Sequence, residues 1–185
     1  MTLAGCMVAY EGNIKFEKAL TGGEGLFGAL KRKATGESLN LMITSGKGVV
    51  YAANKAKELT ILPLNGEKLF CESRSLLAYD QSLRTNTAFV GLRGAASGQG
   101  LFTTTLEGNG NVVIMSDGTA IMLEVSPAEP LFCDPDAFLG YKGNITQEFV
   151  FDVNWRTMIG ETSGESYKLK FSGTGVVYIQ PSENK

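Results

Sequence analysis

Apolar residues occur in short runs along most of this chain, and some runs alternate with polar residues. Lys168–Phe171 and Val177–Gln180 alternate residue by residue, which is typical of strands with one face in solvent. Leu39–Ile43 and Glu58–Leu62 are short runs bounded by glycine, asparagine or proline, as strands between turns are. Asp117-Gly118 lies between two apolar runs and predicts a two-residue hairpin turn. The pattern therefore predicts an all-β protein of short antiparallel strands.

A helical spacing of apolar residues occurs at Gly25–Lys33, where one or two helical turns are predicted. This segment ends in Lys31, Arg32 and Lys33, the only basic run of the chain. One interpretation is a solvated helix end, where cations are favoured by the helix dipole. The other is a contact for RNA or another anion, and the sequence leaves both open.

Residues 35–79 align with residues 97–141 at a constant offset and without a gap. Leu69–Glu72 matches Leu131–Asp134, and the Leu-Ala-Tyr that ends the first stretch matches the Leu-Gly-Tyr that ends the second. Self-similarity at a fixed period indicates an internal repeat. The glycines hold equivalent places in both copies, so they are predicted to be turn and bulge positions.

A third copy is split between the two ends of the chain. Gly173–Val177 matches Gly46–Val50, but the chain reaches Lys185 before another Leu-x-Tyr segment occurs. Met7–Ile14 supplies the missing segment, because it matches two internal segments, Leu76–Leu83 and Phe138–Ile145. The sequence is therefore interpreted as a circularly cut three-fold repeat.

This interpretation predicts one domain of three pseudo-symmetric antiparallel β-sheet repeats, arranged about a pseudo-three-fold axis. The repeats are expected at about residues 11–79, 80–141 and 142–185, with residues 1–10 completing the third. Met7–Tyr10 should then lie in the same unit as Val176–Ile179, with the two termini close together.

Composition supports a single domain. The chain has 185 residues, of which 43% are hydrophobic, and this length is sufficient to bury a core. One repeat alone is too small to be stable, so the three are expected to share one core that includes Leu69, Phe70, Leu131 and Phe132. The net charge of −2 gives no general attraction to nucleic acid or to an anionic membrane. No apolar run approaches the roughly 20 residues of a membrane span.

Histidine is absent, which removes the most frequent general base and metal ligand. No Cys-x-x-Cys pair occurs, and the Gly-x-Gly pieces do not extend to a phosphate-binding loop. One repeat position holds Glu37, Gln99 and Glu165. Because the second copy has an amide there instead of a carboxylate, an exposed turn is favoured over a carboxylate site on a three-fold axis. The sequence therefore predicts no catalytic, cofactor-binding or metal-binding residue and no cofactor.

The cysteines fit a structural role. Cys71 and Cys133 hold the same repeat position beside a Leu-Phe pair and are interpreted as buried strand residues. An odd number of cysteines, three, in apolar surroundings favours a reducing compartment.

Several motifs resemble a known family. They are the segment Gly23–Phe27, the Gly-x-Gly pieces, the Leu-Ala-Tyr at each repeat junction and the ending Gly173–Gln180. Over nearly all of residues 5–181 the chain looks like the family named for altered inheritance of mitochondria protein twenty-four. The resemblance implies a fold similar to that of the trp RNA-binding attenuation protein, repeated within one chain. Some fungal members are implicated in mitochondrial inner-membrane organisation.

The N-terminal region lacks the pattern of a transit peptide, since Glu11, Glu17 and Glu24 are acidic. A bacterial-type cytoplasmic member of the family is therefore expected. The leading hypothesis is a non-enzymatic scaffold or interaction protein that binds a protein partner or forms a homo-oligomer. The alternative is a module for RNA or an anionic ligand, as the fold resemblance implies. A third hypothesis is an enzyme with a carboxylate or cysteine site. A deep pocket that holds two carboxylates would favour this hypothesis.

Overall fold

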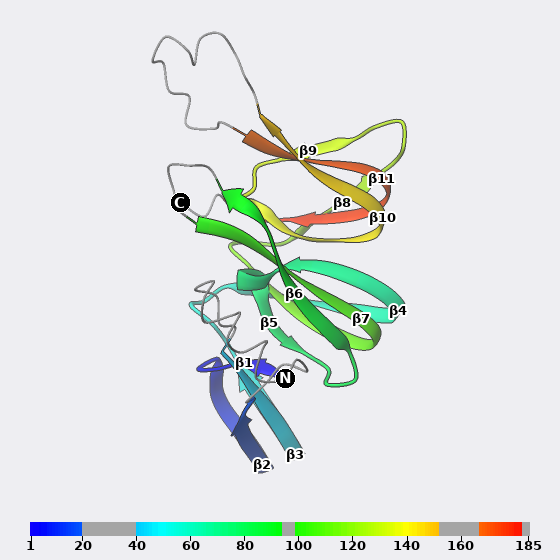
Figure 1. Cartoon of the computed structure of the whole chain (residues 1–185). Coiled ribbons are helices and arrows are strands. Elements are labelled where there is room, and N and C mark those ends of the chain that lie inside the picture. Colours follow the sequence, from blue (N-terminus) through cyan, green and yellow to red (C-terminus); the bar gives the residue numbers. More distant parts are fainter. Residues whose placement is uncertain (20–39, 94–98, 152–166, 183–185) are drawn as a thin grey trace.

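The computed structural model describes residues 1–19, 40–93, 99–151 and 167–182 (Figure 1). These residues form strands, turns and one 3-10 turn, and none of them is in an α-helix. The prediction of an all-β protein is therefore confirmed. The strands are β1 (Thr2–Leu3), β2 (Met7–Lys18), β3 (Leu41–Ala52), β4 (Glu58–Glu72), β5 (Leu76–Tyr79), β6 (Arg84–Arg93), β7 (Gln99–Ser116), β8 (Ile121–Val125), β9 (Leu131–Cys133), β10 (Phe138–Phe151) and β11 (Tyr167–Ile179), and the 3-10 turn is η1 (Ser73–Ser75).

The strands form one antiparallel sheet in the order β2-β3-β1-β5-β7-β4-β10-β11-β8, with β6 on β7 and β9 on β11. Three long hairpins, β2–β3, β6–β7 and β10–β11, follow one another along the molecule in Figure 1. Three strands join them: β1 pairs with β3 and with β5, β5 pairs with β7, and β4 pairs with both β7 and β10. The expectation of three separate sheets is thus corrected: strands shared between neighbouring hairpins make the sheet continuous.

Glycines let the paired strands approach closely in two of the hairpins. Gly12 pairs with Gly48 in β2–β3, and Gly143 pairs with Gly175 in β10–β11. Gly12 has a φ of 89° and Gly143 a φ of 106°, a region that side chains disfavour. A Cβ at either residue would lie only 2.5 or 2.6 Å from a carbonyl oxygen of the opposite strand. The glycines of the sequence pattern are therefore positions of strand contact.

Buried apolar side chains form three clusters rather than the single core that the sequence led us to expect. The largest draws residues from six strands, among them Leu64 of β4, Leu106 of β7 and Leu139 of β10. A second cluster centres on Phe138 and Phe171, whose rings stack with centroids 5.3 Å apart. A third, smaller cluster lies between the N-terminal segment and β7. Each fully buried leucine or phenylalanine contributes about 1.5–3 kcal/mol to folding.

The predicted pairing of the N-terminal strand is wrong. Met7–Tyr10 belongs to β2 and pairs with β3, whereas Val176–Ile179 belongs to β11 and pairs with β10 and β8. In the strand order β2 is at one end and β11 is next to the other, and Figure 1 shows them at opposite ends of the molecule. The reason is that both edges of β11 already have partners, so no edge is left for β2. The three-repeat division and the attenuation protein-like fold stay predictions.

Two smaller expectations also need correction. Asp117-Gly118 does not close a hairpin, because β4 occupies the edge of β7 and the following strand, β8, pairs with β11 instead. Of the four residues expected in the core, Leu69 is buried and Phe70 and Leu131 are half-buried, but Phe132 is exposed. The predicted helix at Gly25–Lys33 lies outside the described residues.

Candidate functional site

The cysteine thiols are poor nucleophiles in this fold. Cys71 is fully buried in β4, and burial together with the neighbouring Glu72 carboxylate raises the pKa of its thiol. The same two causes, burial and the neighbouring Asp134, raise the pKa of Cys133 to about 12. Only the thiolate attacks an electrophile, so both side chains are unreactive at neutral pH. Both lie in strands as expected, but of the two only Cys71 is buried, because Cys133 is half-buried in β9.

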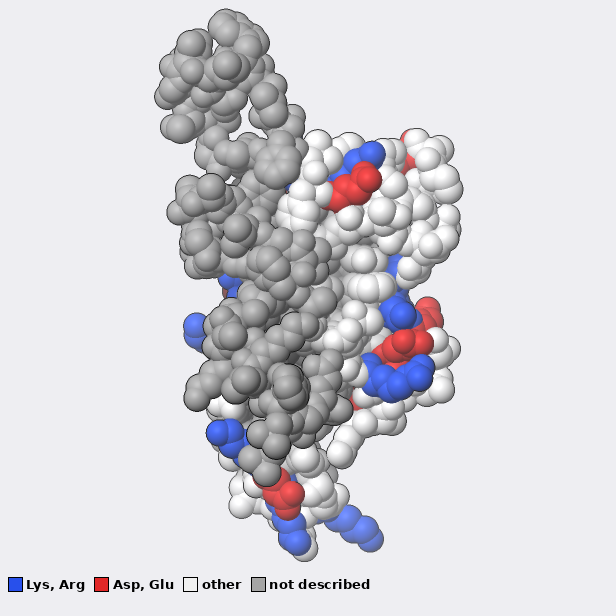
Figure 2. All heavy atoms as spheres, in the orientation of Figure 1, with Lys and Arg blue, Asp and Glu red and all other residues white. Residues whose placement is uncertain are grey.

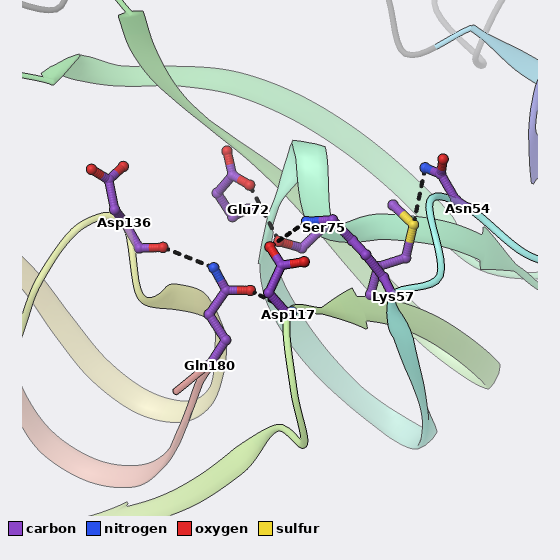
Figure 3. Close-up of polar contacts among 8 residues, drawn as sticks. Asn54, Lys57, Glu72, Ser75, Asp117, Asp136 and Gln180 are labelled. Atoms are coloured by element: carbon purple, nitrogen blue, oxygen red, sulfur yellow. Dashed lines mark hydrogen bonds and ion pairs between the residues drawn. The ribbon is translucent and has the colours of Figure 1, made fainter. Parts of the chain in front are cut away.

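A buried carboxylate that the sequence did not reveal lies where β4 ends. Glu72 is 3% exposed, and its carboxylate accepts hydrogen bonds from the Arg74 Nε (2.9 Å) and the Ser75 Oγ (3.3 Å). The hydroxyl of Ser73, which lies between Glu72 and Arg74 in the sequence, shares a 2.9 Å hydrogen bond with the hydroxyl of Thr104 on β7. A buried charge requires such partners. These hydrogen bonds therefore hold η1 between β4 and β5, and the Glu72 carboxylate oxygens already have hydrogen-bond donors (Figure 3).

Gln180 joins turns that are far apart in sequence, as Figure 3 shows. Its Oε1 accepts a hydrogen bond from the Asp117 backbone N–H, and its Nε2 donates to the Asp136 carbonyl, both at 3.0 Å. The Asp117 carboxylate also pairs with Lys57 at 2.8 Å. These contacts have a structural role, because they connect the turns after β3, β7, β9 and β11. No sequence motif marked Gln180, since its partners are distant backbone groups.

Metal binding finds no support in the described part of the chain, where no group of three or more potential metal ligands occurs. Asp134 and Asp136 form a turn of their own, in which the Asp134 carboxylate accepts the Asp136 N–H at 2.7 Å.

Positive charges are interleaved with negative ones on the described surface. Six ion pairs neutralise most of the basic side chains that can be described, and Figure 2 shows blue and red atoms side by side. Arg84 and Lys68, for example, both contact Glu107. The predicted anion contacts Lys31, Arg32 and Lys33 lie outside the described residues.

Large apolar side chains are exposed at one end of the sheet. Val8 and Tyr10 on β2 are 65% and 50% exposed, and Val49 and Tyr51 on β3 are similarly open. Directly paired residues share a face of a sheet, so Tyr10 lies on the face of its partner Val50, and Tyr51 on the other face. We call these four residues, Val8, Tyr10, Val49 and Tyr51, the β2–β3 apolar end.

The opposite end of the sheet has its own exposed apolar residues. Ile121 and Met122 lie on β8, and Phe132 on β9 is 50% exposed. We call these three residues the β8–β9 apolar edge. Two further exposed residues, Leu59 and Ile61, lie on β4 between the two ends. Sequence reasoning missed all of these surfaces, because an apolar residue in a strand pattern predicts burial.

The fold defines an all-β protein whose long antiparallel hairpins share one sheet. The chain belongs to the family described as Mitochondrial biogenesis AIM24, whose sequence pattern matches residues 1–182. The resemblance noted in the sequence is thereby confirmed. Among the described residues, no helix is long and apolar enough to cross a membrane.

Comparison with solved structures supports the fold. The chain is similar to protein SPYM3_0169 from Streptococcus pyogenes, known from an X-ray crystal structure, with a TM-score of 0.74. The two are 22% identical, and the match covers 98% of this chain and 82% of that one. At this identity the likeness concerns the fold alone. No curated protein matches the chain in sequence.

Proposed function

We propose that the chain is a non-enzymatic scaffold that binds a protein partner through the β2–β3 apolar end. The observation that carries this proposal is the exposure of four large apolar side chains, Val8, Tyr10, Val49 and Tyr51, at one end of the sheet. They lie on both faces of the β2–β3 hairpin, and large exposed apolar side chains gathered at one end of a sheet mark a site of interaction. Tyrosine is also enriched in the centres of protein interfaces.

The backbone of β3 favours the same kind of partner. On the side away from β2, described strands pair with β3 only at Leu41 and Met42, through β1. The rest of that edge, including Val49 and Tyr51, therefore presents hydrogen-bonding groups to which another strand can be added. A partner bound in this way would gain backbone hydrogen bonds as well as apolar contact.

The polar groups favour a scaffold over an enzyme. Glu72, a buried carboxylate, is held by Arg74 and Ser75, and burial keeps Cys71 and Cys133 protonated. Within the described ranges these groups serve the fold, because Glu72 and Ser75 are buried against each other and both thiols hold their protons. We also propose a cytoplasmic location, which the free cysteines Cys6, Cys71 and Cys133 favour.

Site-specific photo-crosslinking in cells tests the proposal. The photoreactive residue p-benzoylphenylalanine replaces Tyr51 in one variant and Thr146, an exposed residue of β10, in a matched control. We expect a protein adduct of discrete mass from position 51 and none from position 146, because only the first lies in the apolar end. Equal adducts at both positions, or none at either, would contradict the proposal. A nuclease-sensitive adduct would favour the RNA-binding alternative instead.

A further inference from the structure

Two junctions inside the chain join neighbouring hairpins in the same way. At the first, Thr2 of β1 pairs with Ala78 of β5, and Met1 and Tyr79 exchange two backbone hydrogen bonds of 2.9 Å. At the second, Cys71 of β4 pairs with Gly140 of β10, one residue from Phe70. At the first junction the partner, β5, lies just before the β6–β7 hairpin, and at the second the partner is the start of β10.

The second junction is sealed by aromatic side chains. Phe70 of β4 pairs with Tyr141 of β10, and their rings stack with centroids 4.6 Å apart and planes 12° apart. Stacking of this kind adds about 0.5–1.5 kcal/mol to the burial of the rings. Tyr141 is 7% exposed as a result, and so is Tyr79 at the first junction.

The start of β2 has a similar sequence but no described partner on its outer side. Met7–Ile14 aligns with Leu76–Leu83, which covers β5 and the turn before β6, and with Phe138–Ile145 at the start of β10. Val8 and Tyr10 thus take the positions of Leu139 and Tyr141. Leu139 is 0% exposed and Tyr141 is 7% exposed, whereas Val8 is 65% and Tyr10 is 50% exposed. Among the described strands β2 pairs only with β3. The apolar character of this segment therefore fits a contact that the single chain does not make.

The complementary segment is β9, at the other end of the sheet. Leu131–Cys133 aligns with Leu69–Cys71, and Phe132 pairs with Lys170 of β11 as Phe70 pairs with Thr105 of β7. The strands of the described chain leave the other edge of β9 without a partner. Phe132 is 50% exposed there, because no counterpart of Tyr141 covers it.

We propose that these two surfaces bind each other in a head-to-tail contact between copies of this chain. The outer edge of β9 in one copy pairs with Ala9–Glu11 in the next copy, in the register of β4 on β10, and Phe132 stacks on Tyr10. This inference rests on the proposed function and names a second copy as a partner of the β2–β3 apolar end. The two surfaces differ, so the contact is heterologous and leads to rings or filaments. A contact of this small size is expected to be weak and concentration-dependent.

The charged side chains at the proposed contact between β9 and β2 differ from those at the internal junction between β4 and β10. Lys142 of β10 forms a 3.2 Å ion pair with Glu67 of β4. The aligned positions at the proposed contact are Glu11 and Glu129, both exposed and both acidic. Glu11 also accepts a hydrogen bond from the Tyr51 hydroxyl at 3.1 Å. Their repulsion is expected to weaken association, so Glu129→Lys should strengthen it by roughly threefold at low salt.

Sedimentation velocity over a concentration series tests the contact with four proteins. They are the wild type, Tyr10→Lys, Phe132→Lys and the control Ile61→Lys, in which an exposed residue of β4 outside the contact is changed. We expect the mass of the wild type and of the control to rise with concentration, and both contact variants to stay monomeric. An equimolar mixture of Tyr10→Lys and Phe132→Lys should form dimers and nothing larger, because each retains one intact surface. Thermal melts establish that each variant is folded.

Three results would overturn the inference. They are a monomeric wild type at all concentrations, association of Phe132→Lys equal to that of the wild type, and a mixture that stays monomeric. The second result is also what a symmetric β2–β2 contact predicts, because Phe132→Lys leaves β2 intact. If the wild type is monomeric while position 51 still crosslinks to another protein, this inference fails and the proposed function stands.

Discussion

Residues that occupy aligned positions in this chain have different environments, and the environment decides their chemistry. Cys71 and Cys133 both follow a Leu-Phe pair, but Cys71 is fully buried and Cys133 is half-buried in the short strand β9. Val8 and Leu139 are likewise aligned, yet only Leu139 is buried. What differs in each case is whether a neighbouring strand covers the side chain. Local sequence does not contain that information.

The raised pKa of the Cys133 thiol leads to a prediction about stability at alkaline pH. Burial raises its pKa from 9.0 to about 12, so the folded state holds the proton more tightly than the unfolded state. This contribution to stability is present below pH 9 and is lost as the pH rises toward 12. The free energy of unfolding, measured by urea titration, should therefore fall more steeply between pH 9 and pH 11 in the wild type than in Cys133→Ala. If the free energy of unfolding depends on pH in the same way in both proteins, the thiol has the same pKa in the folded and unfolded states.

At the scale of the elements, glycine contacts between strands control the hairpins. Gly143 of β10 lies against Thr174 and Gly175 of β11, and a Cβ there would be 2.6 Å from the Thr174 carbonyl oxygen. Backbone atoms cannot move aside without breaking the ladder between the two strands. Gly66, in β4, also has a positive φ, 83°, but a Cβ there would meet no atom within 4 Å.

Gly143→Ala and Gly66→Ala separate these two effects. Gly143→Ala is expected to cost about 3 kcal/mol, because it combines backbone strain with a collision. Gly66→Ala should cost only about 1–2 kcal/mol, the penalty for the left-handed region alone. Denaturant unfolding of the two variants gives the comparison. Equal losses of stability would mean that the close approach of β10 and β11 does not limit side-chain size.

The sequence predicted the kinds of element well and their partners poorly. Alternating runs such as Lys168–Phe171 do form strands, but Gly143, which belongs to the glycines expected at turns and bulges, lies inside the ladder of β10 with β11. The pairing of Met7–Tyr10 was wrong, because similarity between segments shows that they are alike but not which neighbour each one meets. The Asp117-Gly118 turn failed for the same reason: a distant strand competes for the edge that a hairpin would use. Gln180 and Glu72 could not be found, since their partners are brought together only by the folded chain.

At the scale of the whole molecule, the sheet is open at both ends. Inside it, β1 covers β5, which in turn pairs with β7, and β4 covers the start of β10. At its ends, β2 and β9 present the same kinds of edge without a described partner. A molecule built in this way can extend its own pattern of strand pairing into a second copy, and this is the central claim of the proposed contact.

Hydrogen–deuterium exchange as a function of protein concentration tests that claim most directly. Backbone amides become protected when they enter a strand ladder, and fragments covering Val8–Tyr10 and Leu131–Cys133 report on the two proposed edges. We predict that both fragments exchange more slowly as concentration rises, in parallel, while a fragment around Gly66 is unchanged. Protection of neither edge, or of only one, under conditions where the protein associates would contradict the head-to-tail contact.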